Sequence, residues 1–486
     1  MLKEESSLLP NNNQNSFLIN MDTINAICSV FTLYNKIFVE LKQYSTLSIM
    51  AACDMVAAYD QSNVRVVSDP KLVPDSKILA DAVYWWKYAA ATFGWQYGLG
   101  YQYKKGLGGL IDGLFGNTLV NNEKVLCESC MIQTEDIIVA SWHGKLFTPG
   151  YYIALDHSSK SIVVAIRGSF ELRDAIIDLT AESVNFFEPT LSSSESDSDS
   201  GFESDLNPND SNIDSNIDKT NHVDIKTDKT NHVDIKNDKT NYVDKTKHLD
   251  KTNHVDNKVH KGMLDAAFNV KKLIDNHFKQ TLEKFPDYQI IVTGHSLGAA
   301  VAAILTIWWA TEYGEKINIH AFCYGCPPVL SIDLAKKYSQ YITTFINGND
   351  CIPYLSYGSV DDLKFKLLQI LEQSPGFFGR IFQACHIGNP FKLSNDTVKK
   401  MENFFNTPAI PKIIPIENPN NMQRLWVPGE IIHLCQKNKD TALINILEPA
   451  QLSNIYLTNG MFKDHMPDQY EYALNSAYKQ TSNDDF

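Results

Sequence analysis

Apolar and polar positions along the chain form two kinds of run, one typical of buried strands and one typical of helices. Runs rich in β-branched residues predict strands at 151–155, 161–166, 289–293, 318–324 and 341–346. Apolar residues at helical spacing predict helices at 263–282, after the third strand to about 313, and near 334–341. Buried strands that alternate with helices indicate a mostly parallel sheet covered on both faces. The pattern therefore predicts an α/β fold.

The stretch 190–259 interrupts this pattern. It opens with an acidic serine tract at 192–205 and then repeats a short polar unit, first seen at 218–224, with one valine or leucine among charges. Repeats that stack need a regular apolar face, which these units lack, so we expect a disordered insertion. Its histidines also suggest a metal tract, but a solvated spacer is favoured because nothing there fixes ligand geometry; they are His222, His232, His248 and His254.

The remaining chain divides by composition into three parts. We expect an N-terminal helical extension at 1–75, a main domain at 76–478 that contains the insertion, and a flexible tail at 479–486. The first residues lack the basic start and apolar run of a signal peptide. The most hydrophobic early stretch, 78–115, is interrupted by charges, whereas a membrane span needs about 20 consecutive apolar residues. The sequence thus predicts a cytoplasmic protein without a transmembrane helix.

Charge and cysteine content narrow the range of partners. A net charge of −14 over 486 residues disfavours nucleic acid, because binding phosphate requires a basic surface. Nine irregularly spaced cysteines do not form a disulfide framework, which indicates a reduced, intracellular setting. Two Cys-x-x-Cys pairs, at 127–130 and 323–326, lie too far apart in the chain to suggest a zinc site, so no metal is expected.

The segment 291–300 carries the clearest chemical signal. It reads Ile-Val-Thr-Gly-His-Ser-Leu-Gly-Ala-Ala, a β-branched strand that breaks at a Gly-x-Ser-x-Gly motif and continues as a small-residue helix. A serine is activated by a histidine, so its hydroxyl must stand clear of the sheet on a sharp strand-to-helix turn. This context predicts a nucleophile elbow with Ser296 as the nucleophile.

A nucleophilic serine also needs an acid and a base, expected in the chain order serine, acid, histidine. Asp350 follows the strand 341–346, where an acid at a strand end is able to orient an imidazole. His465 lies in a loop just before a helix, whereas His433 lies inside an alternating strand, so His465 is favoured as the base. His386 and His295 are weaker candidates, since His295 fills the variable position of the elbow.

Two backbone amides are expected to stabilise the oxyanion. The amide of Leu297 directly follows the nucleophile at a helix N-terminus, where the dipole favours negative charge. The second amide should follow an earlier strand, and Ser169 after the strand 161–166 supplies it, with Gly168 allowing the turn.

These residues resemble the class 3, or fungal-type, lipases. The resemblance rests on Thr-Gly-His-Ser-Leu-Gly-Ala-Ala at 293–300, Val-Ala-Ile-Arg-Gly-Ser at 164–169 and His-Lys-Gly at 260–262. Within that group the chain is most similar to sn-1-specific diacylglycerol lipases. The similarity covers about 78–478 apart from the insertion, with supporting stretches at 87–95, 152–157, 173–180, 428–433 and 464–467.

The resemblance implies an α/β-hydrolase fold and hydrolysis of a fatty acyl ester of an acylglycerol. It implies a triad of Ser296, Asp350 and His465, with Ser169 and Leu297 as the oxyanion pair. It implies no required cofactor, and calcium only as a family possibility. A phospholipase A1 or acyltransferase with the same triad, and a catalytically silent lipid-binding protein, are the alternatives, because a triad fixes the acyl-enzyme and not the alcohol.

A lipid substrate predicts peripheral contact with a membrane or lipid droplet, through an apolar cover that moves. In class 3 lipases the lid follows the first oxyanion loop, here 178–190, with Val184, Phe186 and Phe187 as candidate interfacial side chains. A second candidate is the apolar stripe within 363–382. Core packing is an equal alternative for the first and the favoured one for the second.

Overall fold

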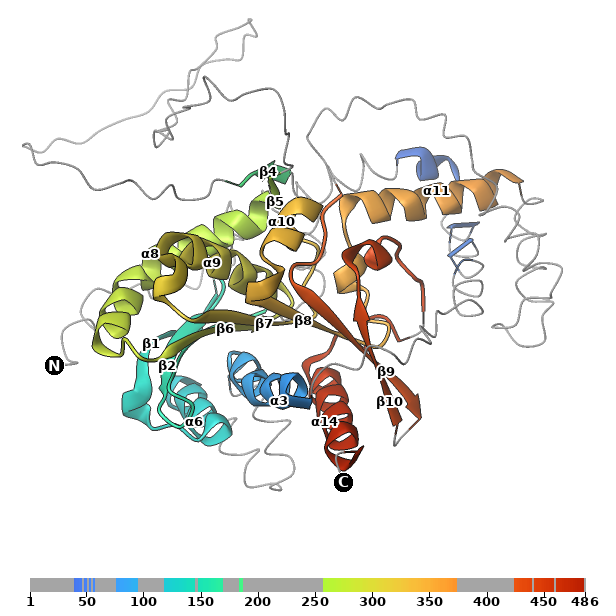
Figure 1. Ribbon diagram of the computed structural model, residues 1–486. Coiled ribbons are helices and arrows are strands. Elements are labelled where there is room, and N and C mark those ends of the chain that lie inside the picture. Colours follow the sequence, from blue (N-terminus) through green and yellow to red (C-terminus); the bar gives the residue numbers. More distant parts are fainter. Residues whose placement is uncertain are drawn as a thin grey trace, which may run out of the picture. The chain divides into compact units, whose positions relative to one another are not determined.

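The chain is described by a computed structural model in which eight strands form one sheet (Figure 1). The described residues are 39–45, 48–49, 52–53, 56, 76–94, 118–144, 147–168, 183–186, 257–373, 424–438, 441–458 and 460–484. The strand order is β1-β2-β3-β6-β7-β8-β9-β10. Their bounds are β1 Ile137–Ser141, β2 Tyr151–Asp156, β3 Ser161–Ile166, β6 Gln289–His295, β7 Ile319–Tyr324, β8 Ile342–Asn347, β9 Glu430–Asn438 and β10 Thr441–Leu447.

The five strands from β3 to β9 run parallel, whereas β1, β2 and β10 pair antiparallel at the two edges. The predicted α/β-hydrolase architecture with a mostly parallel central sheet is thus confirmed. The strand pattern did not show that β2 and β3 run antiparallel. Only four residues connect them, and a parallel crossover needs a dozen or more.

Helices cover both faces of the sheet (Figure 1). One face carries α8 (Lys261–Lys284), α9 (Leu297–Tyr313) and α10 (Ile332–Lys337), and the other carries α3 (Ser76–Ala91), α6 (Thr118–Cys130) and α14 (Pro467–Asp484). Because side chains alternate along a strand, β3 serves both layers. Ile162, Val164 and Ile166 pack with α8 and α9, while Val163 and Ala165 pack with α3 and α14.

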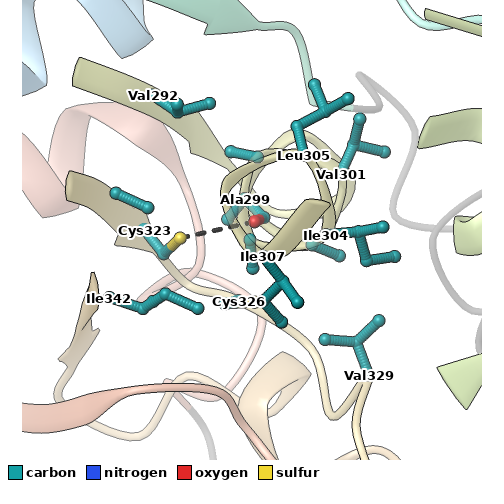
Figure 2. Packing of buried hydrophobic residues seen from close by; sticks show 14 of the residues in the cluster. Val292, Ala299, Val301, Ile304, Leu305, Ile307, Cys323, Cys326, Val329 and Ile342 are labelled. Carbon is teal, nitrogen blue, oxygen red and sulfur yellow. Dashed lines mark hydrogen bonds between the residues drawn. The ribbon is translucent and has the colours of Figure 1, made fainter. Parts of the chain in front are cut away.

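Helix α9 lies at the centre of the first layer, and Figure 2 shows its packing. Its buried face uses small side chains, which let it approach the strands closely. Val292, Cys323 and Ile342 pack around it from β6, β7 and β8. The Cys323 thiol also donates to the Ala299 carbonyl at 3.3 Å. A helix that is buried almost all round is held by this packing rather than by an amphipathic stripe.

Several boundaries differ from the sequence prediction. Residues 190–256 of the expected insertion lie outside the described part of the chain, so its disorder stays a prediction. Its predicted end at 259 is two residues too late, because β5 (Lys258–His260) pairs with β4 (Ser183–Asn185), and Val259 is fully buried against that partner. The expected tail likewise begins later, since α14 continues to Asp484.

The predicted N-terminal extension is described only in part. Residues Val39–Gln43 form the 3-10 helix η1, and the buried side chains of Leu41, Ala52 and Val56 pack against α11 (Tyr357–Gln373). In the described ranges, no helix combines the length and apolar character that a bilayer span requires. The other short 3-10 helices are η3 Thr134–Asp136, η4 Gly314–Lys316, η5 Ser339–Tyr341, η6 Ile352–Tyr354 and η7 Pro449–Leu452.

Candidate active site

Ser296 occupies a sharp turn between β6 and α9. Its backbone has φ 58° and ψ −127°, a conformation that L-residues adopt rarely and that points to strain held by the surroundings. The turn brings β6 and α9 so close that a Cβ on Gly294 would lie 2.5 Å from the Gly298 carbonyl oxygen. A Cβ on Gly298 would collide with the carbonyl oxygen of Ile166 in β3. The two glycines are therefore a steric condition for this turn.

The structure brings Ser296, His465 and Asp350 into one hydrogen-bonded chain. His465 Nε2 lies 2.9 Å from Ser296 Oγ, and His465 Nδ1 lies 2.8 Å from Asp350 Oδ2. The three residues are 1%, 4% and 0% exposed, respectively. Because a carboxylate only accepts hydrogen bonds, Nδ1 carries the proton and Nε2 is left to accept from the serine hydroxyl.

Asp350 is held by two further donors. The amide of Ile352 donates to Oδ1 at 2.9 Å, and the Tyr470 hydroxyl donates to Oδ2 at 2.6 Å. Burial raises the pKa of Tyr470 well above its usual range, so this phenol stays a donor. Gly325, at φ +58°, passes directly beside the site, where a Cβ would lie 3.0 Å from both Asp350 Oδ2 and Tyr470 Oη.

Tyr470 is a site residue that sequence reasoning missed. It lies five residues after His465, in the first turns of α14, and no motif marks it. The only available signal was its position one helical turn inside a helix that follows the candidate base.

The loop that carries His465 is fixed to the end of β8 through Asp464. Its carbonyl accepts from Asn347 Nδ2 at 2.8 Å, and its carboxylate accepts from the Asn349 amide at 2.8 Å. Gly348, at φ +51°, gives this carboxylate room, since a Cβ there would lie 2.5 Å from it. Burial raises the pKa of Asp464. The base is therefore anchored beside the acid by backbone and side-chain bonds.

The two other described candidate histidines, His433 and His295, bond to backbone carbonyls. His433, in β9, bonds through Nε2 to the Gly348 carbonyl at 2.7 Å, and burial lowers its pKa. His295 bonds through Nε2 to the backbone carbonyl of His465 at 2.9 Å. His386 lies outside the described residues.

Of the two predicted oxyanion donors, only Leu297 lies within the described residues. Leu297 is the first residue of α9, where the N–H groups have no acceptor within the helix. Ser169 lies outside the described residues, but β3, which leads to it, ends beside the elbow, with Ile166 paired to Gly294. Gly168 continues that approach, since a Cβ there would collide with the His295 carbonyl.

The candidate lid residues are described in part. Phe186 is buried, and its ring stacks on Trp308 with centroids 6.1 Å apart. Val184 is half-buried in β4, and Phe187 lies outside the described residues. In the second candidate stripe, Phe365 on α11 is 47% exposed. Within the described ranges, no cluster of three or more His, Cys, Asp and Glu is arranged to hold a metal ion.

Comparison with known proteins confirms the similarity to class 3 lipases. Residues 226–359 match the family model described as lipase (class 3). Diacylglycerol lipase-beta of Mus musculus is 22% identical over 375 residues, which cover 71% of this chain and 46% of that protein. Diacylglycerol lipase-alpha of Homo sapiens is 23% identical over 247 residues, which cover 49% of this chain and 18% of that protein. The chain thus spans less than half the length of either relative.

A solved structure of a lipase from Rhizopus microsporus var. chinensis shows a weaker likeness. It has 15% sequence identity and a TM-score of 0.40, and the match covers 81% of this chain and 88% of that chain.

Proposed function

We propose that this chain is a class 3 lipase, a serine hydrolase that cleaves fatty acyl esters of acylglycerols. The observation that supports it best is the buried chain of hydrogen bonds from Ser296 through His465 to Asp350. A serine, histidine and carboxylate in this order form the arrangement by which an imidazole activates a hydroxyl. The diacylglycerol lipases among its relatives supply the substrate class.

In the proposed mechanism, Ser296 Oγ attacks the ester carbonyl while His465 Nε2 takes its proton. Asp350 accepts from Nδ1–H throughout and stabilises the imidazolium that forms. The imidazolium then gives its proton to the departing glycerol oxygen, which leaves an acyl group on Ser296. Water, deprotonated by His465, attacks this acyl-enzyme, and the imidazolium returns that proton to Ser296 Oγ as the fatty acid leaves.

The amides of Leu297 and Ser169 are the proposed donors to the tetrahedral oxyanion. The Leu297 N–H points out of the first turn of α9, and the helix dipole adds to its effect. Losing one such donor typically lowers the rate by about 10²–10³. No cofactor is proposed for this chemistry, because the three side chains and two amides supply the nucleophile, the proton transfers and the charge stabilisation.

Ser296 and His465 are 1% and 4% exposed. We propose that a covering segment moves before an ester reaches Ser296 Oγ. An apolar cover that opens at a lipid surface fits an acylglycerol substrate, and we propose peripheral contact with such a surface. The segment 178–190 remains the predicted lid.

Hydrolysis by the wild-type chain and by Ser296→Ala tests the proposal. Micelles of diacylglycerol, triacylglycerol and phospholipid are offered separately, and released fatty acid is measured. We expect hydrolysis of an acylglycerol by the wild type and a loss of at least about 10³-fold in the variant, because no other hydroxyl reaches His465 Nε2 in the described site.

The same assay separates the alternatives. Preference for phospholipid would make the chain a phospholipase A1, and transfer of the acyl group to an added alcohol in place of water would make it an acyltransferase. Equal release by the wild type and Ser296→Ala, with both folded, would reject the proposed nucleophile.

A further inference from the structure

Two consecutive carbonyls in the loop that carries His465 are held by side chains from the ends of two different strands. The Asp464 carbonyl accepts from Asn347 at the end of β8, beside the acid. The next carbonyl, that of His465 itself, lies 2.9 Å from Nε2 of His295 at the end of β6, beside the nucleophile. The loop of the base is thus fixed to both strands that carry its partners.

The His295 imidazole has a defined role in this bond. A carbonyl only accepts, so Nε2 carries the proton and Nδ1 is the unprotonated nitrogen. Nδ1 is buried and has no hydrogen-bond partner among the residues that the structure describes. The ring is 2% exposed and sits among aromatic side chains, with ring centroids of Trp86 at 5.8 Å, Phe93 at 5.9 Å and Tyr470 at 5.3 Å. These contacts fix the ring so that Nε2–H faces the loop.

The imidazoles of His295 and His465 also lie against each other. Their centroids are 4.6 Å apart and their planes are inclined by 33°. Burial and the neighbouring His465 lower the pKa of His295. A neutral His295 adds no charge beside the base when His465 takes up the serine proton.

We propose that His295 is a positioning residue that couples the nucleophile elbow to the loop of the catalytic base. A peptide bond joins His295 to Ser296, and its side chain donates a hydrogen bond to the backbone carbonyl of His465. The peptide bond and the hydrogen bond together connect Ser296 to His465 by a second short path, and this path sets the distance between Ser296 Oγ and His465 Nε2. This role rests on the proposed hydrolase function, because it matters only if His465 acts on Ser296.

A role in core packing alone would need the ring and not the N–H. Two substitutions separate the two properties. His295→Phe keeps an aromatic ring of similar size among the side chains of Trp86, Phe93 and Tyr470, and it removes the N–H donor. His295→Gln removes the ring but places an amide N–H at about the reach of Nε2.

Amide hydrogen exchange of the peptide covering 460–466 tests the coupling without reference to activity. We expect faster exchange in His295→Phe than in the wild type, and near-wild-type exchange in His295→Gln. Exchange that is unchanged in His295→Phe, or that rises in His295→Gln alone, would overturn the coupling.

Kinetics on a soluble p-nitrophenyl ester test its consequence for the reaction. A misplacement of about 1 Å is able to cost about 10²-fold, so we expect His295→Phe to lower kcat by roughly 10- to 100-fold with little change in KM. His295→Gln should recover most of that loss. His320→Phe is the matched control. His320 lies at the end of β7 far from the site, where it bonds to Thr343 of β8, so this variant should keep the wild-type kcat.

The outcomes for the coupling and for the proposed function are distinct. Covalent labelling of Ser296 in the wild-type chain by a fluorophosphonate tests the proposed function without using either His295 variant. If the wild type labels and His295→Phe retains its kcat, or if His295→Gln is the more damaged variant, His295 is a packing residue and the inference is wrong.

Discussion

Helices α8 and α9 pack on one face of the sheet largely through aliphatic and small side chains, with Phe278 of α8 stacked on Trp309 of α9, whereas α3 and α14 contribute several tryptophan and tyrosine side chains to the other face. On the first face, the site depends on close approach, as at Gly294 and Gly298. On the second, it depends on hydroxyl donors, above all Tyr470 on Asp350. The nucleophile is therefore placed by steric fit, and the acid and base are placed by hydrogen bonds.

The difference predicts different costs of substitution on the two faces. A side chain added at a close backbone contact destabilises the fold, because the backbone atoms of β3 cannot move away without breaking the sheet. A lost hydrogen bond leaves the packing intact and lowers the precision of the site. Substitutions at the close backbone contacts of the first face should therefore reduce stability, and those on the second face that remove a hydrogen bond to the triad should reduce activity first.

Gly298→Ala should have the largest effect on stability. A methyl group at this position would collide with the Ile166 carbonyl oxygen and lie 2.8 Å from the carbonyl carbon of Arg167. We expect a loss of at least about 3 kcal/mol in the free energy of unfolding, measured by urea denaturation.

Gly314→Ala is the matched control for that substitution. Gly298 is the second residue of α9, and Gly314 directly follows the same helix at φ +56°, but a Cβ on Gly314 meets nothing within 4 Å. Its cost should be only the backbone penalty of about 1–3 kcal/mol for this rarely adopted conformation. Equal losses in the two variants would contradict the steric account of the elbow.

Tyr470→Phe should have the largest effect on activity from the second face. The change removes the donor at 2.6 Å from Asp350 and keeps the ring that stacks on Trp86. A hydrogen bond to a charged group contributes about 1.5–3 kcal/mol, and about 1.4 kcal/mol corresponds to tenfold in rate. We expect kcat on a soluble ester to fall about tenfold or more while KM stays unchanged. A wild-type kcat in this variant would remove Tyr470 from the account.

Tyr152→Phe should have the smallest effect. The Tyr152 hydroxyl donates to the Tyr88 carbonyl at 2.6 Å, in the same aromatic layer but without contact to the triad. Thermal unfolding should show a loss of about 1 kcal/mol, with kcat unchanged. A fall in kcat comparable to that of Tyr470→Phe would mean that the whole layer, and not one bond, sets the activity.

The same contrast explains what the sequence could predict. Ser296 was found because its strand, its flanking glycines and its helix are contiguous in the chain. Asp350 and His465 were found as candidates because each lies in a loop next to a regular element, where an expected chain order applies. The contact that joins them to Ser296 spans 169 residues between Ser296 and His465, and only the fold makes it visible.

Tyr470 and Asn347 could not be predicted, because their partners are brought to them by tertiary packing. A tyrosine in an amphipathic helix and an asparagine at a strand end are common without any such role. The edge strands β1 and β10 were not predicted either. Residues in β1 are half-buried throughout, although its sequence, Ile-Ile-Val-Ala-Ser, is as apolar as those of the buried strands β2 and β3, so apolar content does not reveal an edge position.

Covalent labelling by a fluorophosphonate tests the central claim most directly, because the probe reacts only with a serine that a neighbouring base activates. The labelled chain is digested and the modified residue is identified by mass spectrometry. The account predicts one modification, on Ser296, that disappears in Ser296→Ala and slows strongly in His465→Ala. A folded wild-type chain that stays unlabelled, or a label on another residue that persists in Ser296→Ala, would contradict it.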